Sequence, residues 1–357
     1  MSWLRNDDPF DTLWPPRRNR YSTPNGGDLQ SDIDRWMQGQ QFLTNTTGTE
    51  PTQCRIVLNL PEKLSHVALT EADLLRLVGR KTVVDRTQQQ IFDTLVAAAS
   101  TSLWFVKISG SGLRLAHFLA QCCAETLAFT LLEERFAYTD QARLTKIFGN
   151  YLTAEQEKRF VARDEKTRHK DAKAAFIKAK QDAITKATPK PKTPAEQAAL
   201  DKALAAAKTL TAEDLVALQK AYAEADKAEF AMRIELANTV YGGRNGNNQP
   251  GDGYRFRGRG LLHLTFRGNY KAAGSALSLP LESKPDMVAE PDTALRTAVW
   301  YWEQNKLNEE ADGDNVLRVS KGVNCGSPNS TSEPNALEDR KKLTKLAKEI
   351  WGDRQPE

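Results

Sequence analysis

Cysteine is scarce in this sequence. The 357 residues include only four cysteines, Cys54, Cys122, Cys123 and Cys325, and two of them are adjacent. This number is too small for a disulfide scaffold in a chain of this length, so we expect reduced thiols. The four histidines are scattered, and the sequence has no C-x-x-C and no H-E-x-x-H motif. We therefore expect no metal site.

Signatures of nucleotide binding are absent too. There is no G-x-x-x-x-G-K-[ST] and no G-x-G-x-x-G after a strand, so the sequence predicts no cofactor. The charge is almost balanced, with 50 basic and 46 acidic side chains and hence 50 − 46 = +4, which does not require a polyanionic partner. The strip Tyr254–Arg257 alternates aromatic and basic residues, as some single-strand binders do, but it is one short instance. Nucleic acid is not an expected ligand.

Long apolar runs are missing as well. No stretch approaches the roughly 18 apolar residues of a membrane span, and the mean hydropathy is −0.57. The segment Met1–Asp8 has neither the basic nor the apolar part of a secretory signal. We expect a chain that is made in the cytoplasm, does not insert into a membrane, and reaches any outside site of action by another route.

Composition divides the chain into four parts. Residues 1–85 are rich in turn-forming residues and are expected to be a leader with a small accessory region, including a strand at Cys54–Leu60 and a helix capped by Thr70. Residues 86–153 and 230–352 have the apolar patterns of one helical domain in two parts. Residues 154–229, rich in Ala, Lys, Glu and Asp, are expected to form an inserted helical hairpin.

The hairpin is marked by three helix-start signals. Thr153, Thr193 and Thr211 each precede an acceptor side chain three residues on, which is the spacing of a capping box. We expect a first arm of about 34 residues, roughly 50 Å long at 1.5 Å per residue. Two interpretations remain, a solvated spacer and a partner-recognition arm.

The segment from Leu113 to Ala128 is apolar on nearly all sides of a predicted helix, with Glu125 near its end. Burial and the negative end of the helix dipole are both expected to raise the pKa of Glu125, as a general acid requires. The alternative is an exposed carboxylate at the helix end. Glu133 and Glu134 can supply a partner carboxylate only if the helix breaks before Glu133, because eight helical residues span about 12 Å. Otherwise they form a surface ion-pair cluster.

Turns and helices follow in the last third of the chain. Turn-forming residues at 241–247 and 250–253 precede Tyr254–Arg257, and the pattern predicts a small β-hairpin, or wing. Helices are expected at Thr293–Asn305 and at Ala336–Trp351. The aromatic run at 300–302 is interpreted as core, with a sugar-stacking platform as the alternative.

These residues resemble the family 19 glycoside hydrolases, in particular their lysozyme-like endolysin and chitinase branch. The stretch from Leu113 to Tyr138 is similar to the family's L-R-L-A-H-F-L-A-Q pattern and the carboxylates after it. The block from Tyr241 to Tyr270, the N-C-G at 324–326 and the L-E-D-R at 337–340 are three further matches in the same order. The resemblance covers about 88–151 and 230–351, and leaves the leader and the hairpin unexplained.

The resemblance implies a mainly α, lysozyme-like two-lobed fold with a small β-wing, and inverting cleavage of a β-1,4-linked amino-sugar polymer. Glu125 falls at the family's general acid, and Glu133 or Glu134 at the base that activates water. Thr265 falls where a hydroxyl helps to hold that water. Positions expected to contact sugar or support the carboxylates are Asn269, Tyr270, Asn324, Arg340 and His263.

Some residues depart from the family pattern. The family's H-E-S-G-G is Ala124–Ala128 here, which removes the two glycines that would ease a bend before the second carboxylate. His263 stands where the family has Gln, and Cys325 where it has Gly. A degenerate, non-hydrolytic glycan-binding protein is therefore one alternative.

The leading hypothesis is a muramidase that cleaves peptidoglycan glycan strands, either a phage-type endolysin or an antibacterial effector. It would act at the cell wall or in the periplasm after lysis or specialised secretion. An effector would have a secretion-machinery component and a cognate immunity protein as partners. A chitinase with the same chemistry is the other alternative.

Overall fold

The computed structural model describes residues 65–357, which are mainly helical, and divides them into two compact units. We call residues 65–134 with 241–357 the core unit, and residues 135–240 the hairpin unit. The predicted mainly α fold is confirmed. The predicted leader up to residue 64, with its strand at Cys54–Leu60, lies outside the described residues. In the described part, every helix is too short or too polar to cross a membrane.

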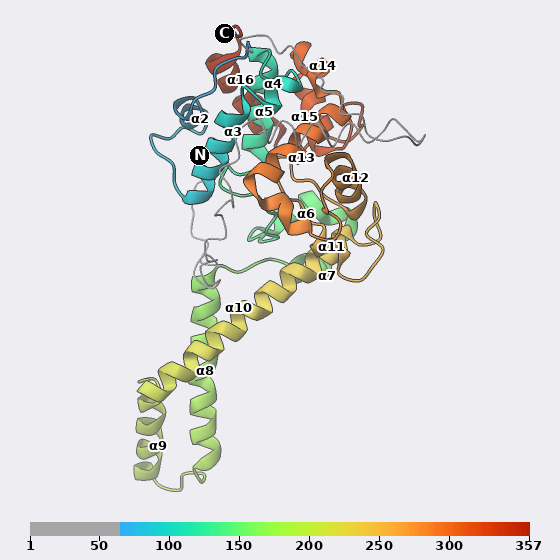
Figure 1. Ribbon diagram of the computed structural model, residues 1–357. Helices are drawn as coiled ribbons and strands as arrows, with labels where there is room; N and C mark the ends of the chain where they lie inside the picture. Colours follow the sequence, from blue (N-terminus) through green and yellow to red (C-terminus); the bar gives the residue numbers. More distant parts are fainter. Residues whose placement is uncertain (1–64) are drawn as a thin grey trace, which may run out of the picture. The chain divides into compact units, whose positions relative to one another are not determined.

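The core unit is built around α5 (Figure 1). This helix begins after Ser111, whose side chain accepts a hydrogen bond from the Arg114 amide, and it packs mainly against α16. A Cβ at Gly112 would lie 1.9 Å from the carbonyl oxygen of Trp351, so only glycine allows this approach. The helices of the unit are α2 (Glu71–Leu77), α3 (Arg86–Ala98), α4 (Ser102–Phe105), α5 (Gly112–Glu125), α11 (Asp252–Arg255), α12 (Arg267–Leu277), η3 (Pro285–Ala289), α13 (Pro291–Gln304), α14 (Leu307–Asp312), α15 (Val316–Asn324) and α16 (Leu337–Trp351).

The apolar circumference predicted for α5 is confirmed. Ten of its residues are buried, from Gly112 to Cys123, and Phe118 packs edge-on against Trp302 at 5.3 Å between ring centroids. Trp302 is fully buried, so it is a core residue as predicted, whereas Trp300 and Tyr301 are half-buried. Of the cysteines in the described part, Cys122, Cys123 and Cys325 are all free thiols.

The predicted β-wing does not form. Tyr254 and Arg255 belong to the short helix α11, which begins after Gly251 in the left-handed conformation. The Asp252 side chain accepts hydrogen bonds from the Gln249 amide and from Arg267, and this closes the turn into a helix. In residues 65–357 the β-type backbone pairing is limited to two isolated bridges, Glu133 with Arg259 and Arg259 with Leu264.

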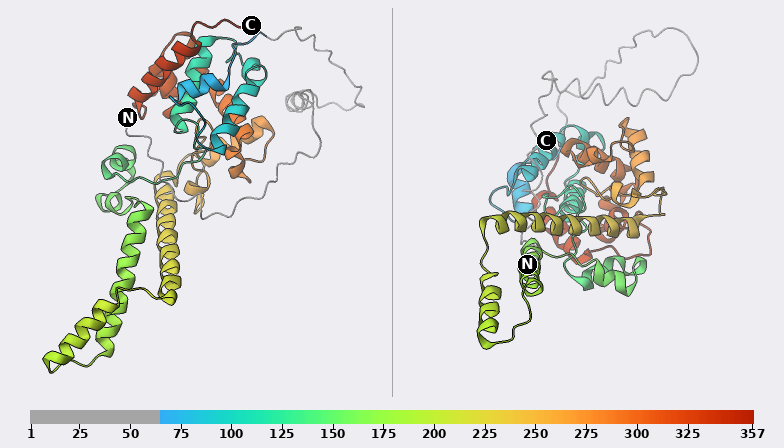
Figure 2. Two further views of the ribbon diagram at one scale, coloured as in Figure 1. Left: turned by 90° about the vertical axis from the view of Figure 1, so that its left-hand side faces the viewer. Right: turned by 90° about the horizontal axis from the view of Figure 1, so that it is seen from below.

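The hairpin unit has the predicted helix starts but shorter helices. Thr153, Thr193 and Thr211 form complete capping boxes, as predicted. The prediction of a first arm of about 34 residues is wrong. The helix is interrupted at 160–164, and Asp164 caps the start of a new helix. The helices are α6 (Gln141–Phe148), η2 (Gly149–Tyr151), α7 (Ala154–Arg159), α8 (Glu165–Ala187), α9 (Pro194–Ala206) and α10 (Ala212–Tyr241), of which α8, α9 and α10 follow one another through short turns (Figure 2).

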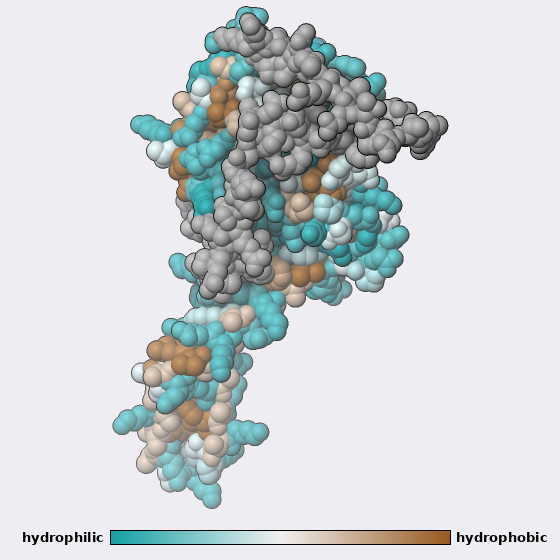
Figure 3. Space-filling view, viewed as in Figure 1, coloured by the Kyte–Doolittle hydropathy of each residue, from teal (hydrophilic) through white to brown (hydrophobic). Residues whose placement is uncertain are grey.

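Ion pairs, more than apolar burial, join α8 to α10. Arg168 is the single buried residue of α8, and α9 buries none. The Arg168 guanidinium lies 2.8 Å from Asp226, with both side chains at least 93 % buried (5 % and 7 % exposed), and His169 contacts the same carboxylate at 3.0 Å. The surface of this unit is mostly hydrophilic with scattered apolar patches (Figure 3), and Leu215 and Val216 are among its exposed apolar side chains.

We predict that Asp226→Ala destabilises the hairpin unit by about 3–5 kcal/mol, because it leaves the Arg168 charge buried without its carboxylate. Hydrogen exchange of the α8 and α10 amides measures this loss. The matched control is Lys227→Ala on the same helix, which breaks an ion pair whose side chains are 76 % and 75 % exposed and should cost less than about 0.5 kcal/mol. Equal amide protection in the two variants would contradict the prediction.

Candidate active site

Glu125 is the last residue of α5. The helix ends there because Leu127, Ala128 and Phe129 all have positive φ angles, of 47°, 62° and 63°. Thr126 caps the turn: its hydroxyl donates to the Cys122 carbonyl at 2.6 Å and accepts from the Phe129 amide at 3.0 Å. The break before Glu133 that a second carboxylate requires is thus present.

The bend forms without the glycines of the family pattern. Leu127 and Ala128 occupy left-handed conformations that cost a non-glycine residue roughly 1–2 kcal/mol each. Gln88 of α3 holds the bend from outside, since its amide nitrogen donates to the Ala128 carbonyl at 2.7 Å. The buried Phe129 ring packs edge-on against Phe92 at 5.7 Å. Contacts from the core therefore offset the backbone strain.

Glu125 is surrounded by donors. One carboxylate oxygen accepts from the buried Arg340 guanidinium, and the other lies 3.7 Å from His263 Nδ1. Asn324 also donates to it. Burial raises the pKa of Glu125, but the charges of Arg340 and His263 and the hydrogen bonds from Arg340 and Asn324 outweigh burial and lower it. The expectation of a raised pKa was wrong, because it rested on burial and the helix dipole and did not include the charge of Arg340.

Glu134 lies in less charged surroundings. Tyr241 donates its hydroxyl to both carboxylate oxygens, at 3.1 and 3.0 Å, and the Gly258 amide is 3.4 Å from Oε2. Burial raises the pKa of Glu134 to about 7, against these two hydrogen bonds, and the negative charge of Glu125 contributes to the rise. Glu125 and Glu134 are therefore electrostatically coupled, and their pKa values are shifted in opposite directions.

Glu133 points to different partners from Glu134. Its carboxylate pairs with Arg257 and lies 3.8 Å from Arg259, and its side chain is 37 % exposed. Neighbouring residues on an extended segment face opposite ways. The segment is fixed by backbone bonds from the Glu134 amide to the Gly258 carbonyl and from the Gly260 amide to the Leu132 carbonyl. The structure thus brings Glu134, and not Glu133, to Glu125.

Gly258 allows this approach. A Cβ there would lie 3.2 Å from the His263 Cβ and 3.3 Å from both Glu134 Oε2 and Thr265 Oγ1. All three distances are shorter than an ordinary van der Waals contact. A side chain at this position would push Glu134 away from the amide that it accepts from.

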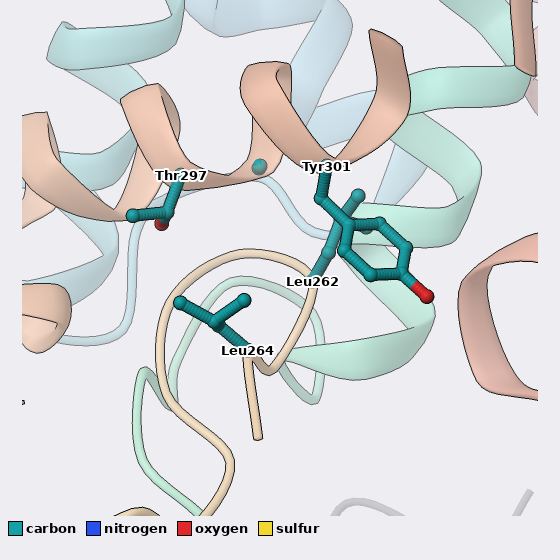
Figure 4. Close-up of a pocket in the computed structure, with 5 residues that line it drawn as sticks. Leu262, Leu264, Thr297 and Tyr301 are labelled. Atoms are coloured by element: carbon teal, nitrogen blue, oxygen red, sulfur yellow. The ribbon is translucent and has the colours of Figure 1, made fainter. Parts of the chain in front are cut away.

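His263 is held by its neighbours. Leu262 and Leu264 pack against Thr297 and Tyr301 of α13 around a small apolar cavity (Figure 4). The carboxylates do not line this cavity. Burial lowers the pKa of His263, against the attraction of Glu125.

The other predicted site residues surround this pair or support it. The Thr265 hydroxyl donates to the His263 carbonyl at 2.8 Å, and Asn269 donates to the Thr265 carbonyl at 2.8 Å. Tyr270 is fully buried and donates to the Arg257 carbonyl, one residue before Gly258, so it supports the wall behind Glu134.

Three residues that contact Glu133, Glu134 or Arg340 were not assigned a role from the sequence: Tyr241, Arg257 and Gln121. Tyr241 opens the Y-G-G-R-N-G block, and Gln121 lies one helical turn before Glu125. Both positions were visible as parts of motifs, but only the fold shows their contacts. In the described residues no cluster of His, Cys, Asp and Glu could hold a metal ion.

Comparison with known proteins shows similarity to glycoside hydrolases of family 19. Residues 153–321 match the family model of the class I chitinases, glycoside hydrolase family 19. This match begins after Glu125 and Glu134, so it includes neither carboxylate.

Three similar proteins illustrate the range of relatives. A family 19 glycosyl hydrolase domain-containing protein of Haemophilus influenzae is 36 % identical over 110 residues, which are 30 % of this chain and 50 % of that protein. An endochitinase of Arabidopsis thaliana is 32 % identical over 128 residues, 35 % and 46 % of the two chains. A protein named inactive endochitinase, also from A. thaliana, is 34 % identical over 77 residues, 21 % and 28 % of the chains. The chain thus spans about half the length, or less, of the relatives that it matches.

We predict that Ala128→Gly raises the free energy of unfolding, by up to about 1 kcal/mol, because it removes the cost of a left-handed alanine. The control is Ala97→Gly, at an exposed position of the regular helix α3, which should lower stability by about 1 kcal/mol. Urea unfolding of both variants measures the two changes in the free energy of unfolding, which should have opposite signs. A loss of stability in Ala128→Gly as large as in Ala97→Gly would contradict a strained bend.

Proposed function

We propose that the chain contains a family 19 glycoside hydrolase domain and that it hydrolyses β-1,4 bonds of an amino-sugar polymer, with Glu125 and Glu134 as the acid–base pair. The observation that carries this proposal is the electrostatic interaction of two partly buried carboxyl groups whose pKa values are shifted apart. Such a pair is how one site holds an acid and a base at the same pH.

The proposed reaction is an inverting hydrolysis, as the family resemblance implies. One carboxyl group gives its proton to the leaving glycosidic oxygen as the C–O bond breaks. The other takes a proton from water, whose oxygen forms the new bond to the anomeric carbon from the opposite face. The active form of the pair therefore carries one proton.

In the free protein this proton resides on Glu134, since Arg340 stabilises the ionised form of Glu125. The resemblance assigns proton donation to Glu125. A proton on Glu134 in the free protein is compatible with donation by Glu125. The two carboxyl groups interact, so they titrate as a pair, and the pair with one proton is the same titration state whichever group carries that proton. We propose that Glu125 donates from this state, and that glycan binding weakens its contact with Arg340.

The proposed substrate is the glycan strand of peptidoglycan. The resemblance of Leu113–Tyr138 to the lysozyme-like branch supports it. Chitin is the second candidate, because the plant relatives are named endochitinases. A non-hydrolytic glycan binder is the third, because one relative is named inactive.

We predict that the protein releases muropeptides ending in reducing N-acetylmuramic acid from purified sacculi. Glu125→Gln and Glu134→Gln should each lose about 10²–10⁴-fold in rate, the usual contribution of a general acid or base. Glu133→Gln is the matched control and should keep most of the activity, since its side chain pairs with Arg257. The measurement is mass spectrometry of the products.

The other outcomes of this digestion separate the alternatives. Soluble oligosaccharides from chitin with sacculi left intact would replace the muramidase proposal by a chitinase. Binding to sacculi without cleavage, with Glu125→Gln behaving like the wild type, would overturn hydrolysis altogether.

The alkaline limb of the pH profile should lie near the Glu134 pKa of about 7, because above it both carboxyl groups are ionised and no proton is left to donate. Tyr241→Phe removes a hydrogen bond that favours the ionised Glu134, so we predict that this limb moves to higher pH. The control is Tyr301→Phe, whose hydroxyl donates to the Gly322 carbonyl and whose loss should leave the limb in place. The profile of kcat/KM measures both, and a downward shift in Tyr241→Phe would contradict the assignment.

A further inference from the structure

A polar stripe runs along one face of α5, which is otherwise apolar. His117, Gln121 and Glu125 are spaced by four residues, so their side chains lie above one another on the helix. His117 and Gln121 are fully buried. Buried polar side chains require partners. The hydrogen-bond partners of this stripe come from residues 314–340, and Glu125 has His263 as an additional ionic contact. His117 contacts Asp314 at 2.9 Å, and Glu125 contacts Arg340.

Gln121 is bonded at both ends of its amide. Its carbonyl oxygen accepts from Arg340 Nη1 at 2.6 Å, and its Nε2 donates to the buried Ser320 hydroxyl at 3.3 Å. Turning the amide over would place its NH₂ group against the guanidinium, donor against donor. Arg340 and Ser320 therefore fix the amide in one orientation.

Each side of the Arg340 guanidinium has one acceptor. Its Nε donates to the Asn335 carbonyl at 2.9 Å, its Nη1 to Gln121, and its Nη2 to Glu125. Arg340 is 3 % exposed, so water does not substitute readily for a lost partner. With Nε and Nη1 held, the plane of the guanidinium is set, and Nη2 points at Glu125.

We propose that Gln121 is a positioning residue that fixes the Arg340 guanidinium against Glu125 and thereby keeps Glu125 ionised in the free protein. This inference rests on the proposed function for its consequence in catalysis. The expected effect is on the acid limb of the pH profile, the pH below which activity falls because Glu125 becomes protonated. The alkaline limb, which Glu134 sets, should not change.

Other groups also act on Glu125, and they have to stay constant in the test. The attractive ones are Arg340 and His263, and Asn324 donates a neutral hydrogen bond. The ionisable groups that feel the negative charge of Glu125 are Glu134, Tyr301, Cys122 and Cys325. Gln121 hydrogen-bonds Arg340 and Ser320, so a substitution at Gln121 reaches Glu125 mainly through Arg340.

The experiment is a titration of the Glu125 carboxyl group by NMR in full-length protein with ¹³C-labelled glutamate, assigned with Glu125→Gln. Gln121→Met keeps the length of the side chain but removes the acceptor, so we expect Glu125 to titrate at higher pH than in the wild type. Gln121→Glu keeps the acceptor and adds a negative charge that shares Arg340, and should also move the titration upward. If Gln121→Met fails to fold, Gln121→Glu still decides.

Two serine variants serve as comparisons. Ser320→Ala leaves the bond from Arg340 to Gln121 in place and should shift Glu125 less than Gln121→Met does. Ser109→Ala removes a buried hydroxyl that donates to the Ala99 carbonyl, with no charged partner, and should leave the titration unchanged. An unchanged Glu125 titration in both Gln121 variants, or an equal shift in Ser109→Ala, would overturn the proposal.

The pH profile gives the second readout. In the Gln121 variants the acid limb of kcat/KM should move upward while the alkaline limb stays near pH 7. Below the new limb, activity falls about tenfold for each unit by which the limb has moved. If no glycan is hydrolysed at all, the proposed function fails, and the NMR titration still tests the role of Gln121.

Discussion

The geometry of the site depends on one buried cation. Arg340 is 3 % exposed, and each side of its guanidinium has a protein acceptor. A buried charge without partners costs several kcal/mol, so the surrounding acceptors cannot move independently of it. Glu125 and Gln121 come from α5, and Arg340 comes from α16, so the same guanidinium that sets the ionisation of Glu125 also ties these two helices together.

A second constraint is close approach of backbones. Gly112 lets α5 touch the end of α16, and Gly258 lets Glu134 reach a backbone amide. Between these two contacts the chain has to turn sharply after Glu125, and it does so through three left-handed residues. The strain is tolerable because Thr126 closes the turn internally and Gln88 holds it from α3. The position of Glu134 is therefore determined by contacts on both sides of the bend.

Local signals in the sequence predicted local structure. The caps at Thr70, Thr153 and Thr193 and the all-round apolar helix α5 are present as expected, because each depends on residues within a few positions of one another. Contacts between distant residues were not predictable in this way. The choice between Glu133 and Glu134 depends on Arg257 and Gly258, 124 residues further along, and the sign of the Glu125 shift depends on Arg340, 215 residues away. The expected strand at Tyr254 failed for a similar reason, since Arg267 closes the turn around Asp252.

The two carboxylates differ because their donors differ in charge. Glu125 receives its main hydrogen bond from a guanidinium, whereas Glu134 receives its bonds from a phenol and a peptide amide. A neutral donor stabilises a buried carboxylate less than a cation does, so burial prevails at Glu134 and the cation prevails at Glu125. A single proton shared by the pair therefore stays away from Arg340 in the free protein. In the proposed mechanism, proton donation by Glu125 requires a change at Arg340, and the leaving oxygen of a bound glycan, which favours a protonated neighbour, is the group that would supply it.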